Sequence, residues 1–301
     1  MIKILKLTII NKDGEELFKT QGEKISAEYK GEFCEGDKIL INAFMCEFIS
    51  LKLDSTLKES IIFVPGGKFE YEIPFGELKA AGYAEDAFSG DTHLLLAEEA
   101  DEVAYNTRNI SLNPYDTRGQ KRYFPHAYAN LVTREAPCFF ERNAIDGVTE
   151  NHGHGAYPYH SWAGGAREDL EYFIDFGQEV AINKLVFYLR ADFPHDTYWK
   201  SLDVEFSDGT KETANFEKTA EGQELILSEQ KITKTVHLTN FKQAELPFSW
   251  AALTQVEVIG NYLKEDLSKM EIRCASNPKD VKHYTTERLR EEFHISKLFT
   301  K

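Results

Sequence analysis

The stretch YFIDFGQEVAINKLVFYL at residues 172–189 decides the fold class. It holds two runs rich in β-branched and aromatic residues, separated by a polar interruption that begins at Gly177. Runs of this kind, bounded by Gly, Asp and Asn, are typical of strands. They recur in both halves of the chain, at 38–53, 59–67, 68–76, 92–100, 170–177, 182–193, 201–209, 234–241 and 253–263. Their spacing with short turns predicts antiparallel β-sandwiches and argues against alternating strand–helix units.

Helical signals are sparse, and the turns between strands are clear. A helical turn is predicted near GELKAAGYAEDAF (76–88), and Asp208-Gly209 predicts a hairpin because type I′ turns need positive φ. The polar segment 113–130 has little periodicity and indicates a domain boundary near residue 125. The predicted fold is therefore all-β, with two β-sandwich domains and a short C-terminal helix. The predicted ranges are a sandwich at 1–125, a second sandwich at 126–265 and an extension at 266–301.

Composition limits the classes of partner. The 301 residues carry a formal net charge of −15, which argues against nucleic acid or an anionic membrane, because both need clustered Lys and Arg. No run approaches the roughly 20 apolar residues of a membrane span, and the first residues lack the pattern of a signal peptide. The four cysteines are scattered without CxxC spacing. We expect a cytoplasmic protein with reduced thiols.

Five short pieces follow one another in a recognisable order. They are NAIDG at 143–147, SW at 161–162, the stretch at 172–189, VEFSDG at 204–209 and VEVIG at 256–260. Together they resemble the discoidin, or coagulation-factor C-type, family of galactose-binding-like carbohydrate-binding domains, over about residues 130–262. The resemblance implies a jelly-roll sandwich whose loops at one end bind a ligand, commonly a sugar in bacterial members.

The same resemblance implies a structural Ca²⁺ beside the Asp-Gly turn. Ca²⁺ takes about six to eight oxygen ligands, and a turn can supply carbonyls together with carboxylates. The positions that match the family pattern are Asn143, Asp146, Thr149 and Glu257. The alternative interpretation is that Asp146 merely begins a tight turn with Gly147.

Two polar and aromatic loops are the candidate ligand site. They are NHGHGAYPYHSW at 151–162 and RADFPHDTYWK at 190–200, the second directly after a strongly apolar strand. Aromatic faces stack on sugars, while Arg and Asp form charge-assisted hydrogen bonds to hydroxyls. For a uronate, Arg190 is the natural partner of the carboxylate. The candidate ligand-binding residues are His154, Tyr157, His160, Trp162, Arg190, His195, Asp196 and Trp199.

Competing interpretations of these loops stay open. Histidines of HGH with His160 could hold Zn²⁺, although the neighbouring glycines predict a flexible loop. Ser161 lacks a nucleophile elbow, and His195 and Asp196, if on a strand, would point to opposite faces. Trp162 and Trp199 could be core residues. Non-catalytic saccharide binding is therefore favoured, and the alternative is an enzyme of uronate or glycan metabolism with His195 or His160 as general base.

The C-terminal segment changes character. Residues 270–301 predict a short strand, a loop and an amphipathic helix that begins after Thr285. The segment resembles the N-terminal stretch of 4-deoxy-5-hexosulose-uronate ketol-isomerases, but the zinc ligands of those enzymes lie far downstream of this stretch, so isomerase activity is not implied. The resemblance indicates uronate breakdown in a bacterial cell. A further hypothesis is a scaffold that docks on an isomerase, or on a second copy as a homo-oligomer, through 278–301.

Overall fold

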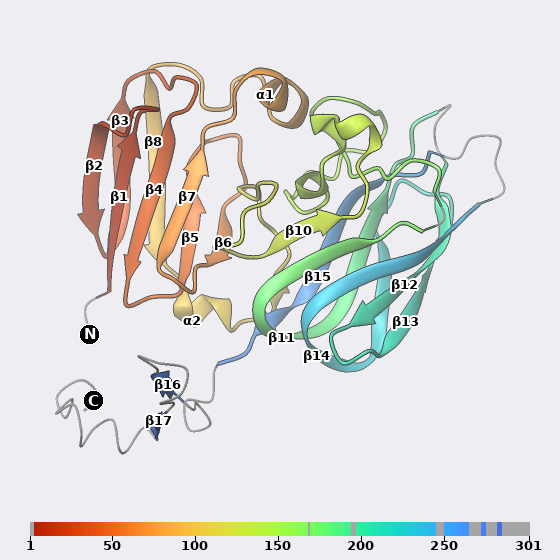
Figure 1. Cartoon of the computed structure of the whole chain (residues 1–301). Coiled ribbons are helices and arrows are strands. Elements are labelled where there is room, and N and C mark those ends of the chain that lie inside the picture. Colours follow the sequence, from red (N-terminus) through yellow and green to blue (C-terminus); the bar gives the residue numbers. More distant parts are fainter. Residues whose placement is uncertain are drawn as a thin grey trace. The chain divides into compact units, whose positions relative to one another are not determined.

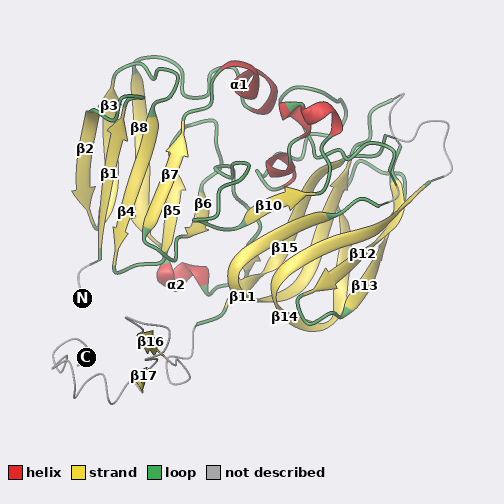
Figure 2. Cartoon of the chain, viewed as in Figure 1, coloured by secondary structure: helices red, strands yellow, loops and turns green. Residues whose placement is uncertain are grey.

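The computed structural model describes residues 3–167, 169–193, 197–244 and 250–264, together with the backbone of 272–274 and 282–284. The chain divides into two compact units, Met1–Tyr262 and Leu263–Lys301. Strands dominate and the helices are short, so the predicted all-β class is confirmed (Figure 2). Among the described residues, no helix is long and apolar enough to span a bilayer.

The first sandwich consists of two antiparallel four-stranded sheets (Figure 1). One sheet has the order β2-β1-β4-β7, with bounds Glu16–Gly22, Ile4–Ile10, Lys38–Phe44 and Lys68–Glu72. The other has the order β3-β8-β5-β6, with bounds Lys24–Lys30, Thr92–Glu99, Phe48–Lys52 and Ser60–Phe63. Alternate residues of both sheets, such as Leu7 and Leu95, are fully buried in one apolar cluster. Period-two burial of this kind is what holds two sheets face to face.

Two short helices flank this sandwich. The helix α1 (Gly76–Gly82) confirms the predicted helical turn, and α2 (Asp101–Ala104) follows β8. The cysteines whose side chains are described, Cys34, Cys46 and Cys138, are free thiols.

The second sandwich is a single folded-over antiparallel sheet with the order β13-β12-β14-β11-β15-β9, in which β10 also pairs with β11. The bounds in chain order are β9 (Arg108–Asn109), β10 (His126–Ala129), β11 (Tyr172–Leu189), β12 (Trp199–Phe206), β13 (Lys211–Asn215), β14 (Gln223–Gln243) and β15 (Leu253–Tyr262). Short 3₁₀ turns η1 (Thr133–Glu135), η2 (Pro137–Phe139) and η3 (Glu141–Ala144) precede β11.

Residues 172–189 form β11, which bends and belongs to both layers. Its first residues pair with β10, and its last residues pair with β15. The register with β14 breaks between Asp175 and Val180, at the polar interruption. The curved ribbons of β11 and β14 are clear in Figure 1. A core that includes the rings of Trp162, Trp199 and Phe241 fills the fold, with Trp199 and Phe241 4.7 Å apart.

The predicted hairpin at VEFSDG is confirmed. The strands β12 and β13 pair across it, and Gly209 has φ of 82° at the turn. The Asp208 side chain accepts a hydrogen bond from the Thr210 amide at 2.8 Å, which closes the turn locally.

The polar segment 113–130 is packed and is not an exposed linker. Asn113, Tyr115 and Tyr123 are almost fully buried, and the ring of Tyr115 lies 5.4 Å from that of Tyr71 in the first sandwich. Beyond Tyr262, β16 (Ile272–Cys274) pairs with β17 (Lys282–Tyr284). The predicted helix after Thr285 lies outside the described residues, as does most of the predicted docking segment 278–301.

Candidate functional site

Three loops meet at one end of the second sandwich. The loop after η3 contains Asn151, whose carbonyl accepts the Ala191 amide of the loop after β11 at 2.9 Å. The Arg190 amide donates to the Ala252 carbonyl, just before β15, at 3.1 Å. These backbone bonds join residues far apart in sequence, so the two loops singled out from the sequence lie side by side.

A charged network ties the loops together through their side chains. The Arg190 and Asp192 side chains are only 5% and 4% exposed, with Nε and Oδ1 3.0 Å apart. The other Asp192 oxygen contacts Nδ1 of His154, and an Arg190 Nη atom donates to the Trp250 carbonyl. Burial lowers the pKa of Arg190, and the charge of Asp192 acts in the opposite direction. The Arg190–Asp192 pair therefore connects three loops: Arg190 reaches the loop before β15, and Asp192 reaches His154 in the loop after η3.

A small cavity of about 190 Å³ opens beside this network. It is lined by His152, Arg190, Ala191, Tyr198, Lys218, Thr219 and Ala220. Ligand pockets for drug-sized molecules are usually about 300–1,000 Å³, so this cavity suits one part of a ligand. Its described lining contains Arg190, Lys218 and His152 and no carboxylate, although Asp192 pairs with Arg190 behind it.

Exposed aromatic side chains gather on the same loops. Five aromatic residues are prominently exposed in the described part of the chain, and three of them are on these loops: Phe193 at 90%, Trp250 at 44% and Tyr159 at 39%. Sequence reasoning missed all three as ligand contacts. Phe193 directly follows Asp192, and the Trp250 carbonyl accepts a hydrogen bond from Arg190, so both residues adjoin the charged network.

Four of the predicted ligand residues are buried, and this corrects the prediction of direct contact. One is Arg190, whose side chain is 5% exposed and pairs with Asp192. Trp162 and Trp199 are fully buried, with rings 5.9 Å apart. The His160 ring is also buried, and its Nε2 lies 2.6 Å from Oδ2 of Asp146. A ring buried in this way does not reach a ligand at the surface, which argues against His160 as the general base of the alternative hypothesis.

The remaining predicted ligand residues divide into three cases. His154 is exposed over 44% of its side chain while it contacts Asp192. Tyr157 is half-buried within the 151–162 loop. Its ring stacks on that of His160, with centroids 5.4 Å apart, and its amide donates to the Ala81 carbonyl of α1. His195 and Asp196 lie outside the described residues.

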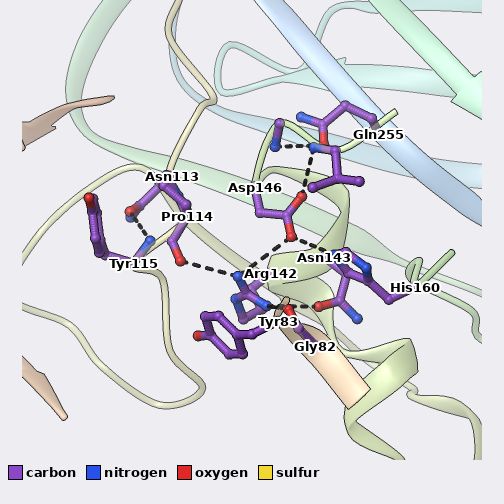
Figure 3. Close-up of polar contacts among 12 residues, drawn as sticks. Gly82, Tyr83, Asn113, Pro114, Tyr115, Arg142, Asn143, Asp146, His160 and Gln255 are labelled. Atoms are coloured by element: carbon purple, nitrogen blue, oxygen red, sulfur yellow. Dashed lines mark hydrogen bonds and ion pairs between the residues drawn. The ribbon is translucent and has the colours of Figure 1, made fainter. Parts of the chain in front are cut away.

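The predicted calcium ligands do not fit Ca²⁺. Figure 3 shows that Asn143 and Asp146 both contact the guanidinium of Arg142. The residue of β15 that reaches the turn is Gln255, not Glu257, because Gln255 Oε1 accepts the Gly147 amide at 3.1 Å. Thr149 lines a separate cavity of about 230 Å³ that also borders Arg142 and Asp146. No cluster of His, Cys, Asp and Glu within the described ranges is suited to a metal ion.

Comparison with known proteins gives one short sequence match and several similar folds. No family model matches the chain. Over 30 residues, 10% of this chain, it is 73% identical to the 4-deoxy-L-threo-5-hexosulose-uronate ketol-isomerase of Lachnoclostridium phytofermentans, and this match spans only 11% of the isomerase.

The solved structures of similar fold include three carbohydrate-binding modules. Chitosan-binding module 1 of a Paenibacillus chitosanase/glucanase is 16% identical, with a TM-score of 0.35, over 50% of this chain and 98% of the module. A fucose-binding module of Streptococcus pneumoniae is 13% identical, with a TM-score of 0.37, over 51% and 95%. The family 32 module of Clostridium perfringens NanJ, solved with galactose, is 11% identical, with a TM-score of 0.35, over 44% and 91%.

Proposed function

We propose that this chain binds a saccharide without turnover, at the three joined loops of its second sandwich. The observation that carries the proposal is the gathering of Phe193, Trp250 and Tyr159 on loops fixed by Arg190 and Asp192. Aromatic faces supply apolar contact for the C–H side of a pyranose ring, and cross-links between the loops reduce the entropy lost on binding.

The preferred ligand is a saccharide that contains a uronic acid. The cavity beside the loops places His152 and Lys218 near Arg190, in a chain whose net charge is −15. The sugar carboxylate is assigned to this cavity, whose described lining includes His152 and Lys218 and no carboxylate. The segment shared with a hexosulose-uronate isomerase supports the same class of ligand.

Isothermal titration with galactose and galacturonate tests both saccharide binding and the preference for a uronic acid, because these sugars differ in charge at one carbon. We expect tighter binding of the uronate, a reduced preference in Lys218→Gln, and at least about tenfold weaker binding in Phe193→Ala and Trp250→Ala. Ile226→Ala is the matched control, since Ile226 is 72% exposed on β14 outside the three loops. Unchanged affinity in both aromatic variants would exclude this site, and product formation would favour an enzyme.

A further inference from the structure

Four oxygen atoms from separate parts of the chain surround the Arg142 guanidinium (Figure 3). Its Nη1 donates to the Gly82 carbonyl at 3.1 Å and to Asn143 Oδ1 at 3.2 Å. Its Nη2 donates to the Pro114 carbonyl at 3.1 Å and lies 3.5 Å from Asp146 Oδ2. Backbone carbonyls, an amide and a carboxylate thus converge on one cation.

The cation is fully enclosed. The Arg142 side chain is 4% exposed, and its guanidinium lies 4.3 Å from the centre of the Tyr83 ring. Burial acts to lower the pKa of Arg142, but nearby groups, including Tyr83 and Asp146, raise it above the ordinary value overall. A buried charge is tolerated only when it is paired and hydrogen-bonded; both Nη atoms of this arginine have oxygen partners, while its Nε has none among the described residues.

The oxygens around Arg142 are already engaged. Asn143 Nδ2 donates to the Pro137 carbonyl at 3.0 Å, which orients its Oδ1 toward the arginine. Asp146 accepts from the Val148 amide through Oδ1 and contacts His160 through Oδ2. The strand β15 offers the neutral amide of Gln255 at this turn. A divalent ion here would therefore meet a fixed guanidinium and only one paired carboxylate, where Ca²⁺ needs several oxygens.

We propose that the guanidinium of Arg142 serves as the structural cation of this fold, in the place where the discoidin-like resemblance implies Ca²⁺. It joins the 143–147 turn to the Gly82 end of α1 and to Pro114. Through Asp146 it also holds His160, at the base of the ligand loop. The order of that loop then depends on the first sandwich and not on a metal ion.

Thermal unfolding of the 301-residue wild type with excess EDTA or with millimolar Ca²⁺ tests whether a metal ion stabilises this fold. We expect the same Tm in both solutions and no heat of Ca²⁺ binding in a titration. A Ca²⁺-dependent rise in Tm, or stoichiometric Ca²⁺ retained after desalting, overturns the proposal. Neither measurement depends on a saccharide, so this outcome is independent of the proposed binding function.

Variants test the role of the arginine itself. Arg142→Met is expected to lower Tm by about 5–10 °C, since it leaves the Asp146 carboxylate buried beside apolar atoms. The control is Arg167→Gln, which removes a guanidinium from an ion pair exposed at 52% and 66%; we expect no change in Tm. An Arg142→Met chain as stable as the wild type overturns the proposal.

A second substitution distinguishes a charge effect from simple loss of packing. Asp146→Asn in the Arg142→Met background is expected to recover part of the lost Tm, because a neutral amide replaces the buried carboxylate that has lost its guanidinium partner. Purely additive losses from the two substitutions overturn the proposal. If Arg142→Met does not fold, the wild-type comparison with EDTA and Ca²⁺ decides.

Discussion

Nε of Arg190 lies 3.0 Å from Oδ1 of Asp192, and the two side chains are almost fully buried at the end of β11. Each partner also reaches another loop, Asp192 through His154 and Arg190 through the Trp250 carbonyl. The pair therefore links the loops that carry the exposed aromatic residues. A buried pair of this kind adds little net stability, but the loss of one partner leaves the other charge uncompensated.

Asp192→Ala is expected to lower the free energy of unfolding by about 3–5 kcal/mol, because the Arg190 guanidinium loses its buried counter-ion. Urea titration followed by tryptophan fluorescence measures the loss. Asp169→Ala is the control, since Asp169 pairs with Arg167 at an exposed site, and its midpoint should not move. An Asp192→Ala midpoint equal to that of the wild type would show that the pair does not support the loops.

Trp199→Ala should act on stability rather than on ligand contact. The side chain is fully buried against Phe241 and Trp162, so its truncation should cost about 3–5 kcal/mol. Trp250→Ala is the matched comparison, because Trp250 is 44% exposed, and it should weaken saccharide binding with little change in Tm. Weaker saccharide binding at unchanged Tm in Trp199→Ala, together with a large loss of stability in Trp250→Ala, would contradict the burial of Trp199.

The strands predicted in the second sandwich are those rich in β-branched and aromatic residues. The stretch at 172–189 forms β11, and 253–263 contains β15. In contrast, β2 (Glu16–Gly22) has an exposed and partly buried pattern throughout, so its alternation is too weak to identify it. The first part of β14 exposes Ile226 and Ile232, and apolar residues on the solvent face blur the period-two signal.

The candidate site was predictable as a pair of loops but not as a set of contacts. The tryptophans Trp162 and Trp199 are buried, whereas Phe193 and Trp250 are exposed. This difference depends on loop geometry, because aromatic residues occur both in the core and on the surface here. One sequence feature did indicate the role of Arg142 as a structural cation, because this residue directly precedes the NAIDG turn. Its role required knowledge that Gly82 and Pro114, distant in sequence, lie beside it.

His126 should make stability depend on pH. Burial lowers the pKa of His126, but the hydrogen bond and charge of Asp116, 2.7 Å away, outweigh this, so its pKa is raised above the ordinary 6.5. A raised pKa in the folded state means that the stabilisation is complete below the unfolded value and is lost as pH rises through the folded value.

The wild type and His126→Gln should therefore differ more in free energy of unfolding at pH 5.5 than at pH 8. Urea titrations at both pH values measure the difference. His152→Gln is a control for histidine loss, since the exposed His152 lies in the ligand loop away from Asp116. A difference that grows with pH would contradict a raised pKa for His126.

Gly260 should tolerate no side chain, because β15 passes too close to β11. A Cβ atom added at Gly260 would lie 2.2 Å from the Ala181 carbonyl oxygen, a backbone atom that cannot rotate away. Gly260→Ala should therefore force the strands apart and cost about 1–3 kcal/mol or more. Gly66→Ala is the control, since a Cβ there meets nothing within 4 Å. Differential scanning calorimetry should show a lower Tm for Gly260→Ala alone; equal values for the two variants would mean that the β11–β15 pairing can relax without loss.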